Sequence, residues 1–77
     1  MTLLENPKYT PNILLNRIIE MLELPSDAAL ARSISMTTSY VCKIRQRQIP
    51  IRETMLWRLH ILTGVPAKTL MEWGGVE

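Results

Sequence analysis

Apolar residues recur at helical spacing along most of the chain, and Pro, Gly, Ser and Thr interrupt them at short intervals. No stretch alternates apolar and polar residues in the way that a half-buried strand requires. Five helices are predicted, and they cover residues 11–24, 27–33, 38–46, 52–63 and 66–73. The expected fold class is therefore all-α, a compact bundle of five short helices.

Several of the predicted helix boundaries carry a local signal. Thr10 can cap the first helix, in which Pro11 takes a position where its missing N–H costs no hydrogen bond. Ser26 and Thr37 are expected to cap the second and third helices, because their side-chain oxygens can accept from free backbone N–H groups. Gly64 can end the fourth helix, since glycine readily adopts the left-handed backbone that follows many helices.

The second and third predicted helices and the turn between them form the segment DAALARSISMTTSYVCKIRQ, residues 27–46. Its apolar positions are Leu30, Ile34, Met36, Val41 and Ile44. Together with the small Ala31, this pattern packs the two helices tightly and leaves one face of the third helix free. Such a pair is typical of proteins that place the second helix in the DNA major groove.

The free face of the third helix carries small, polar and cationic residues, whereas Tyr40, Val41 and Ile44 lie on the other side. Hydroxyl groups can donate to and accept from base edges, and a lysine amine favours O6 and N7 of guanine. Small side chains also allow the helix backbone to approach the bases. The residues predicted to read DNA bases are Thr38, Ser39, Cys42 and Lys43.

The net charge is +2, but the charges are unevenly placed along the chain. The window of residues 28–52 contains no Asp or Glu, and its basic residues are Arg32, Lys43, Arg45, Arg47 and Arg52. An acid-free basic window around a candidate recognition helix indicates a surface for a polyanion. Arg45 and Arg47 lie off the base-reading face or beyond the helix end, so we expect them to contact phosphates.

The segment DAALARSISMTTSYVCKIRQRQIP, residues 27–50, resembles the helix-turn-helix of the lambda-repressor-like (XRE and Cro type) DNA-binding domains. The resemblance covers roughly residues 11–74, because the five-helix layout of that family matches the predicted helices. It implies a sequence-specific, double-stranded DNA-binding repressor of phage or bacterial type. The resemblance also adds residues to the predicted phosphate contacts. The full set is Thr37, Tyr40, Arg45, Arg47 and Arg52.

Two residues depart from the pattern of that family. Ser35 stands in the turn where the family often has glycine, and serine adopts a left-handed backbone less readily, so we expect a strained or differently shaped turn. Asp27 stands where the family favours a neutral donor such as glutamine. Because a carboxylate would repel a phosphate, Asp27 is excluded from the predicted contacts, and backbone N–H groups at the start of the second helix are expected instead.

The fourth predicted helix is apolar on two sides. One stripe consists of Met55, Leu56, Leu59 and Leu62, and Trp57 and Ile61 lie nearly opposite it. A helix of this kind must be covered twice, either by the last helix of the same chain or by a second copy in a two-fold dimer. We expect a homodimer on a near-palindromic operator, with an interface formed by Trp57, Ile61, Met71 and Trp73.

Length and composition exclude several other classes. The 77 residues predict one domain, residues 11–77, preceded by an N-terminal arm, residues 1–10, in which Leu3 and Leu4 could dock on the core or Lys8 could reach DNA. One cysteine, Cys42, excludes an intramolecular disulfide and a multi-cysteine metal site. His60 has no predictable catalytic partner, so no enzyme activity, cofactor or metal is expected.

The chain has neither an apolar run long enough for a transmembrane helix nor the pattern of a secretory signal, so a cytoplasmic location is expected.

Two other functions remain open. A protein-interaction module, antitoxin- or adaptor-like, could use the apolar surface of Trp57, Ile61 and Trp73, with DNA binding secondary. A non-specific architectural DNA binder is disfavoured by the net charge of only +2, because such binding depends on phosphate neutralisation.

Overall fold

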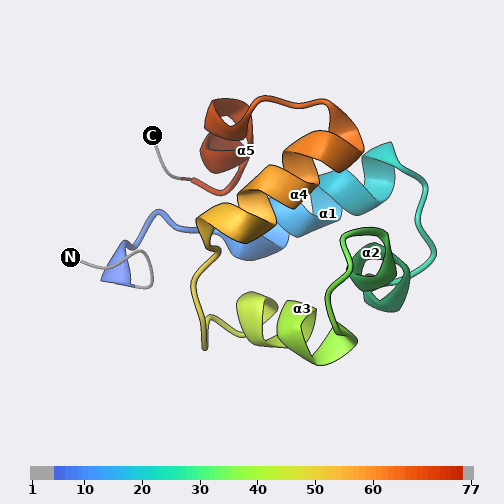
Figure 1. Cartoon of the computed structure of the whole chain (residues 1–77). Helices are drawn as coiled ribbons and strands as arrows, with labels where there is room; N and C mark the ends of the chain where they lie inside the picture. Colours follow the sequence, from blue (N-terminus) through green and yellow to red (C-terminus); the bar gives the residue numbers. More distant parts are fainter. Residues whose placement is uncertain (1–4, 76–77) are drawn as a thin grey trace.

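The computed structural model describes residues 5–75 as five α-helices joined by short connections, with no strand in that range (Figure 1). The helices are α1 Pro11–Met21, α2 Asp27–Ser33, α3 Thr38–Arg45, α4 Glu53–Thr63 and α5 Ala67–Trp73. α2 packs against α3, α1 contacts both α3 and α5, and α4 contacts α5. The prediction of an all-α fold with five short helices is confirmed, and α3 lies along one edge of the molecule, away from α5 (Figure 1).

α2 and α3 each begin with a side-chain cap. Ser26 Oγ accepts a hydrogen bond from the backbone N–H of Ala29 at 3.3 Å, and Thr37 Oγ1 accepts one from that of Tyr40 at 3.0 Å. Both predicted caps are therefore present, and α4 ends as predicted at Gly64, whose φ is +76°. α1 begins as predicted, with Thr10 at the cap position and Pro11 as its first residue, but the side chain of Thr10 makes no capping hydrogen bond.

α1 is shorter than the sequence pattern predicts. It ends at Met21 and not near Leu24, because Glu23 takes a left-handed conformation with φ +53°. The N–H of Leu24 then donates to the carbonyl oxygen of Ile19 at 2.9 Å, which closes the helix end in the manner of a Schellman motif. The apolar periodicity extends into this turn because Leu22 and Leu24 still pack against the core, although they are no longer helical.

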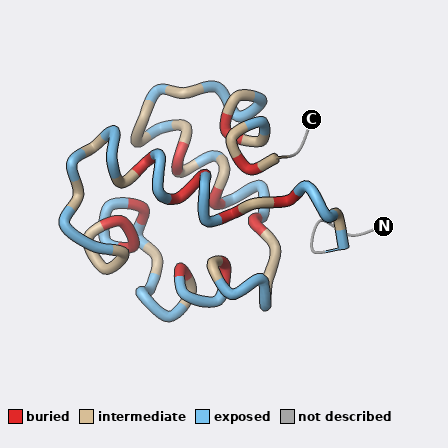
Figure 2. Tube along the Cα trace, turned by 180° about the vertical axis from the view of Figure 1, so that it is seen from behind, coloured by how far each residue is buried: buried red, intermediate tan, exposed pale blue. Residues whose placement is uncertain are grey.

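The core lies between the helices and receives residues from all of them (Figure 2). Its buried members are Tyr9, Leu14, Leu15, Ile18, Leu30, Ala31, Ile34, Val41, Ile44, Ile51, Met55, Leu59 and Leu70. The apolar positions predicted in residues 27–46 and the Met55–Leu62 stripe of α4 all contribute to it. Tyr9 and Ile51 come from outside the helices, and the helical periodicity did not indicate them.

The segment before α1 is part of the packed structure. Tyr9 is 2% exposed, and its hydroxyl accepts a hydrogen bond from the N–H of Ile51 at 3.3 Å. The N–H of Thr10 donates to the carbonyl oxygen of Gly74 at 2.6 Å, so this segment is also tied to the end of α5. The globular unit therefore begins before residue 11, and the predicted arm shrinks accordingly; Leu3 and Leu4 lie outside the described residues.

Gly75 and Lys8 approach each other at this junction of the two ends. The φ of Gly75 is +80°, and a Cβ placed on it would lie 1.8 Å from the carbonyl oxygen of Lys8. Only glycine fits such a close backbone approach with that conformation. The junction therefore depends on the absence of a side chain at this position.

Burial raises the pKa of the Tyr9 hydroxyl above its ordinary value. The folded protein then holds this proton at a pH where the unfolded chain releases it, so the free energy of unfolding falls as the pH rises above about 10. In Tyr9→Phe, we expect that decline to be smaller between about pH 9 and pH 11 in denaturant titrations. If the free energy of unfolding fell equally with pH in the variant and the wild type, the raised pKa of Tyr9 would be contradicted.

Ser35, in the connection between α2 and α3, has a φ of +57° and an exposed side chain. A left-handed conformation strains a residue that has a Cβ, and the gain on removing that strain exceeds the extra backbone entropy that glycine loses on folding. We expect Ser35→Gly to raise the free energy of unfolding by about 0.5–1 kcal/mol in urea denaturation. The matched control, Ser39→Gly inside α3, should lower it by a few tenths to about 1 kcal/mol.

Candidate nucleic-acid interface

α3 presents one polar face to solvent and buries the other. Its two core residues, Val41 and Ile44, are 0% exposed. The residues of the outer face are all exposed, and we call them the base-reading strip: Thr38, Ser39, Cys42 and Lys43. The four residues share one exposed face of α3, as the helical periodicity predicts. In Figure 2 the backbone of exposed residues is pale blue.

α2 and the turn support the strip from behind. Leu30 and Ala31 of α2 are 0% and 1% exposed, and the small Ala31 leaves room for the close contact between α2 and α3. Arg58 of α4 donates from Nη1 to the carbonyl oxygens of Ile34 and Ser35, at 2.9 and 3.1 Å. These carbonyls follow the end of α2, so a cation is favourable there. No local pattern in the sequence indicates this role of Arg58.

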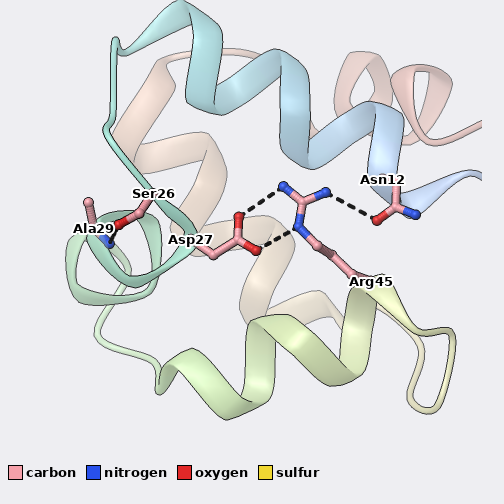
Figure 3. A network of polar contacts seen from close by, with 5 residues as sticks. All are labelled: Asn12, Ser26, Asp27, Ala29 and Arg45. Atoms are coloured by element: carbon pink, nitrogen blue, oxygen red, sulfur yellow. Dashed lines mark hydrogen bonds and ion pairs between the residues drawn. The ribbon is translucent and has the colours of Figure 1, made fainter.

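Arg45 differs from the other predicted phosphate contacts. Its Nε and Nη2 donate to the two carboxylate oxygens of Asp27, at 2.8 and 2.9 Å, and its Nη1 donates to Oδ1 of Asn12 at 3.1 Å (Figure 3). The guanidinium is therefore engaged within the protein and its charge is paired. We withdraw Arg45 from the phosphate contacts, because a DNA phosphate would have to compete with a bidentate carboxylate.

The other four predicted phosphate contacts lie in and around α3. The Thr37 hydroxyl serves as the cap of α3, and Tyr40 is partly buried against the core. Arg47 is exposed, but its Nη2 donates to the carbonyl oxygen of Asn6 at 3.3 Å and its guanidinium lies 5.5 Å from the ring centre of Tyr9. Arg52, at the start of α4, is exposed. Arg47 and Arg52 thus both lie at the surface after α3, but Arg47 is held against the segment before α1.

The residues predicted to form a dimer interface do not share one environment. Trp57 and Ile61, one helical turn apart on α4, are 62% and 65% exposed. Trp73 and Met71 are partly buried, and Trp73 packs against the core while the Arg17 guanidinium lies 5.2 Å from its ring centre. Beside Ile61 there is an open depression lined by Ser33, Ile34, Ser35, Arg58, Ile61 and Leu62. α5 therefore does not cover the outer face of α4.

His60 and Cys42 are the other residues that could carry out chemistry, and each stands apart from any catalytic or metal-binding group in the described residues. His60 Nδ1 lies 2.7 Å from the carbonyl oxygen of Val65, a contact in which the ring nitrogen donates. Cys42 is an exposed free thiol. Within residues 5–75 no three His, Cys, Asp or Glu side chains converge in a way that could hold a metal ion. None of the helices in that range has the length and hydropathy that a membrane span requires.

Comparison of the chain with protein-family models, with curated proteins and with solved structures found no match. The fold class is therefore established by the five helices themselves. The function has to be argued from the surface of α3, from the charges around it and from the exposed face of α4.

Proposed function

We propose that this protein is a sequence-specific double-stranded DNA-binding transcriptional regulator that places α3 in the major groove. The observation that carries the proposal is the division of α3 into a fully buried side, Val41 and Ile44, and an exposed side made of the base-reading strip. An α-helix fits the major groove, where each base pair presents a distinct pattern of donors and acceptors. The exposed side of α3 is the face that would meet those patterns.

The chemistry of the strip suits base edges. Lys43 can donate to guanine O6 and N7, and the hydroxyls of Thr38 and Ser39 can donate or accept. The strip contains no large side chain other than the flexible Lys43, so the backbone of α3 can approach the floor of the groove. Cys42 is small enough to lie against a base without holding the helix away.

The charge distribution favours the same surface. Residues 28–52 contain no acid, and Asp27, just before that window, is paired with Arg45. Lys43 and Arg52 are exposed, so this acid-free window presents positive charge to solvent next to the base-reading strip. A net charge of +2 is small for a protein that binds DNA by charge alone, so base reading has to supply part of the affinity.

The α2–turn–α3 arrangement and the sequence of residues 27–50 support a lambda-repressor-like helix-turn-helix. By that resemblance the protein would act as a repressor that occupies an operator and excludes the polymerase. A two-fold dimer would hold two α3 helices about one DNA turn apart, roughly 34 Å, over a near-palindromic site. The exposed pair Trp57 and Ile61 on α4 is the surface that we assign to this dimer.

The decisive experiment is selection of bound duplexes from a random library, followed by sequencing. We expect enrichment of a short, near-palindromic sequence that survives moderate salt. Binding that falls steeply with salt and enriches no sequence would leave only non-specific phosphate contacts and would refute the proposal.

Truncation of the exposed tryptophan tests the dimer. We expect the wild type to elute as a dimer in gel filtration and Trp57→Ala to elute as a monomer, because large aromatic side chains dominate such interfaces. The matched control is Ile13→Ala on α1, which also removes an exposed apolar side chain, 52% exposed, and should remain dimeric. Monomeric elution of the wild type would contradict the dimer.

A second candidate function rests on the same exposed face of α4. Trp57 and Ile61 could bind a different protein, with DNA binding secondary or autoregulatory. Capture of a stoichiometric protein partner that Trp57→Ala abolishes, together with no enriched DNA sequence, would favour this module. An enriched operator would favour the DNA-binding regulator.

A further inference from the structure

One polar cluster joins three helices at the end of the α2–α3 pair that lies opposite the turn (Figure 3). Arg45 is the last residue of α3, Asp27 is the first residue of α2, and Asn12 lies in the first turn of α1. The side chains of Arg45 and Asp27 are only 21% and 29% exposed. All three helices are thus linked through one guanidinium, whose Nε and Nη2 face Asp27 and whose Nη1 faces Asn12.

We propose that Asp27 and Arg45 are positioning residues, which set the orientation of α3 and so determine where the base-reading strip meets the groove. This inference rests on the proposed DNA-binding function, but its structural part can be tested without DNA. Neither residue is expected to touch a base or a phosphate in this role.

The two ends of α3 are held by different means. At its start, the connection of residues 34–37 ties α3 covalently to α2, and Arg58 holds that connection through the carbonyls of Ile34 and Ser35. At its end, the ion pair joins Arg45 to the first residue of α2. α3 has eight residues, and a helix of that size is about 10–12 Å long, so a small rotation about the turn moves its far end most. Lys43 lies near that far end.

Apolar packing defines the orientation of α3 less precisely than the Asp27–Arg45 pair does. Burial of Val41 and Ile44 favours contact of α3 with the core, but the hydrophobic effect has no direction. A bidentate pair between a planar guanidinium and a carboxylate has a defined geometry, which a lysine amine cannot reproduce. The third contact, to Asn12, fixes the same guanidinium relative to α1.

This role makes a prediction opposite in sign to that of simple electrostatics. Asp27 is an anion at the edge of a surface proposed to bind DNA, and its removal by Asp27→Asn should strengthen non-specific binding. If the pair positions α3, the same change weakens binding to the selected sequence. Arg45→Lys keeps the net charge and could still serve a phosphate contact, yet it removes the bidentate geometry.

Equilibrium binding to the selected duplex and to a scrambled duplex, at one salt concentration, separates these effects. For Asp27→Asn and for Arg45→Lys, we expect the ratio of specific to non-specific affinity to fall about threefold to tenfold. The matched control is Glu72→Gln on α5, which removes one negative charge from a helix that makes no such pair with α3; it should leave the ratio unchanged. A ratio equal to that of the wild type in both variants would overturn the inference.

The positioning role can be tested without DNA by measuring the amide chemical shifts of the free protein. After circular dichroism has shown that the variants retain their helices, we expect shift changes across residues 38–43 in both Asp27→Asn and Arg45→Lys, and none there in Glu72→Gln. Unchanged shifts in the strip would overturn the positioning role. If the wild type prefers no DNA sequence, the proposed function fails, while these shifts still decide whether the pair orients α3.

Discussion

Ile44→Ala is expected to lower the free energy of unfolding by about 2–5 kcal/mol, because it removes three carbon atoms from a side chain that the core encloses completely. A domain of this size has a total stability of only about 5–15 kcal/mol, so the variant loses a large part of it. Thermal unfolding followed by circular dichroism should show the transition shifted down by at least about 10 °C.

The matched control for this loss is Ile61→Ala. It makes the same chemical change on α4, where the side chain is 65% exposed. At protein concentrations low enough to keep the chain monomeric, we expect a change of no more than about 0.5 kcal/mol. If both variants unfolded alike, Ile44 would not anchor the inner side of α3, and the outward direction of the base-reading strip would lose its support.

Lys43→Ala is expected to weaken binding to the selected duplex by about 1–3 kcal/mol, which corresponds to roughly fivefold to 150-fold, if the amine makes a direct base contact. Binding to a scrambled duplex should weaken much less, because only one positive charge is lost. Fluorescence anisotropy with both duplexes at several salt concentrations measures the two effects separately.

Lys68→Ala on α5 is the control for the charge itself, because Lys68 is also an exposed lysine but lies on a helix away from α3. It should change both affinities by the same small factor. An equal loss for the selected and the scrambled duplex in Lys43→Ala would assign Lys43 to a phosphate and would remove it from the residues that read sequence.

Local signals in the sequence were sufficient to predict most of the helical framework. The caps at Ser26 and Thr37 and the end of α4 at Gly64 are decided by a few neighbouring residues, and the structure has them as predicted. The outward face of α3 was also predictable, since helical periodicity places Val41 and Ile44 opposite the strip. Apolar periodicity misled at the end of α1, because Leu24 packs against the core from the turn and not from the helix.

Contacts between residues distant in the sequence were not predictable in the same way. Tyr9 stands in a segment without helical periodicity, and its hydroxyl is hydrogen-bonded to Ile51, 42 positions later. The pattern of charges could not decide whether Arg45 would meet a phosphate or a carboxylate. One signal for the latter was present: Asp27 begins one helix and Arg45 ends the next, and a short turn between two packed helices brings those ends together.

The junction between Lys8 and Gly75 has a practical consequence for the order of the elements. Since the two segments touch, with Thr10 hydrogen-bonded to Gly74, a short peptide could join them and produce a circularly permuted protein. New termini could be opened at Gly64, where an added side-chain carbon would meet no atom within 4 Å. α5 would then lead directly into α1, and α4 would become the last helix of the chain.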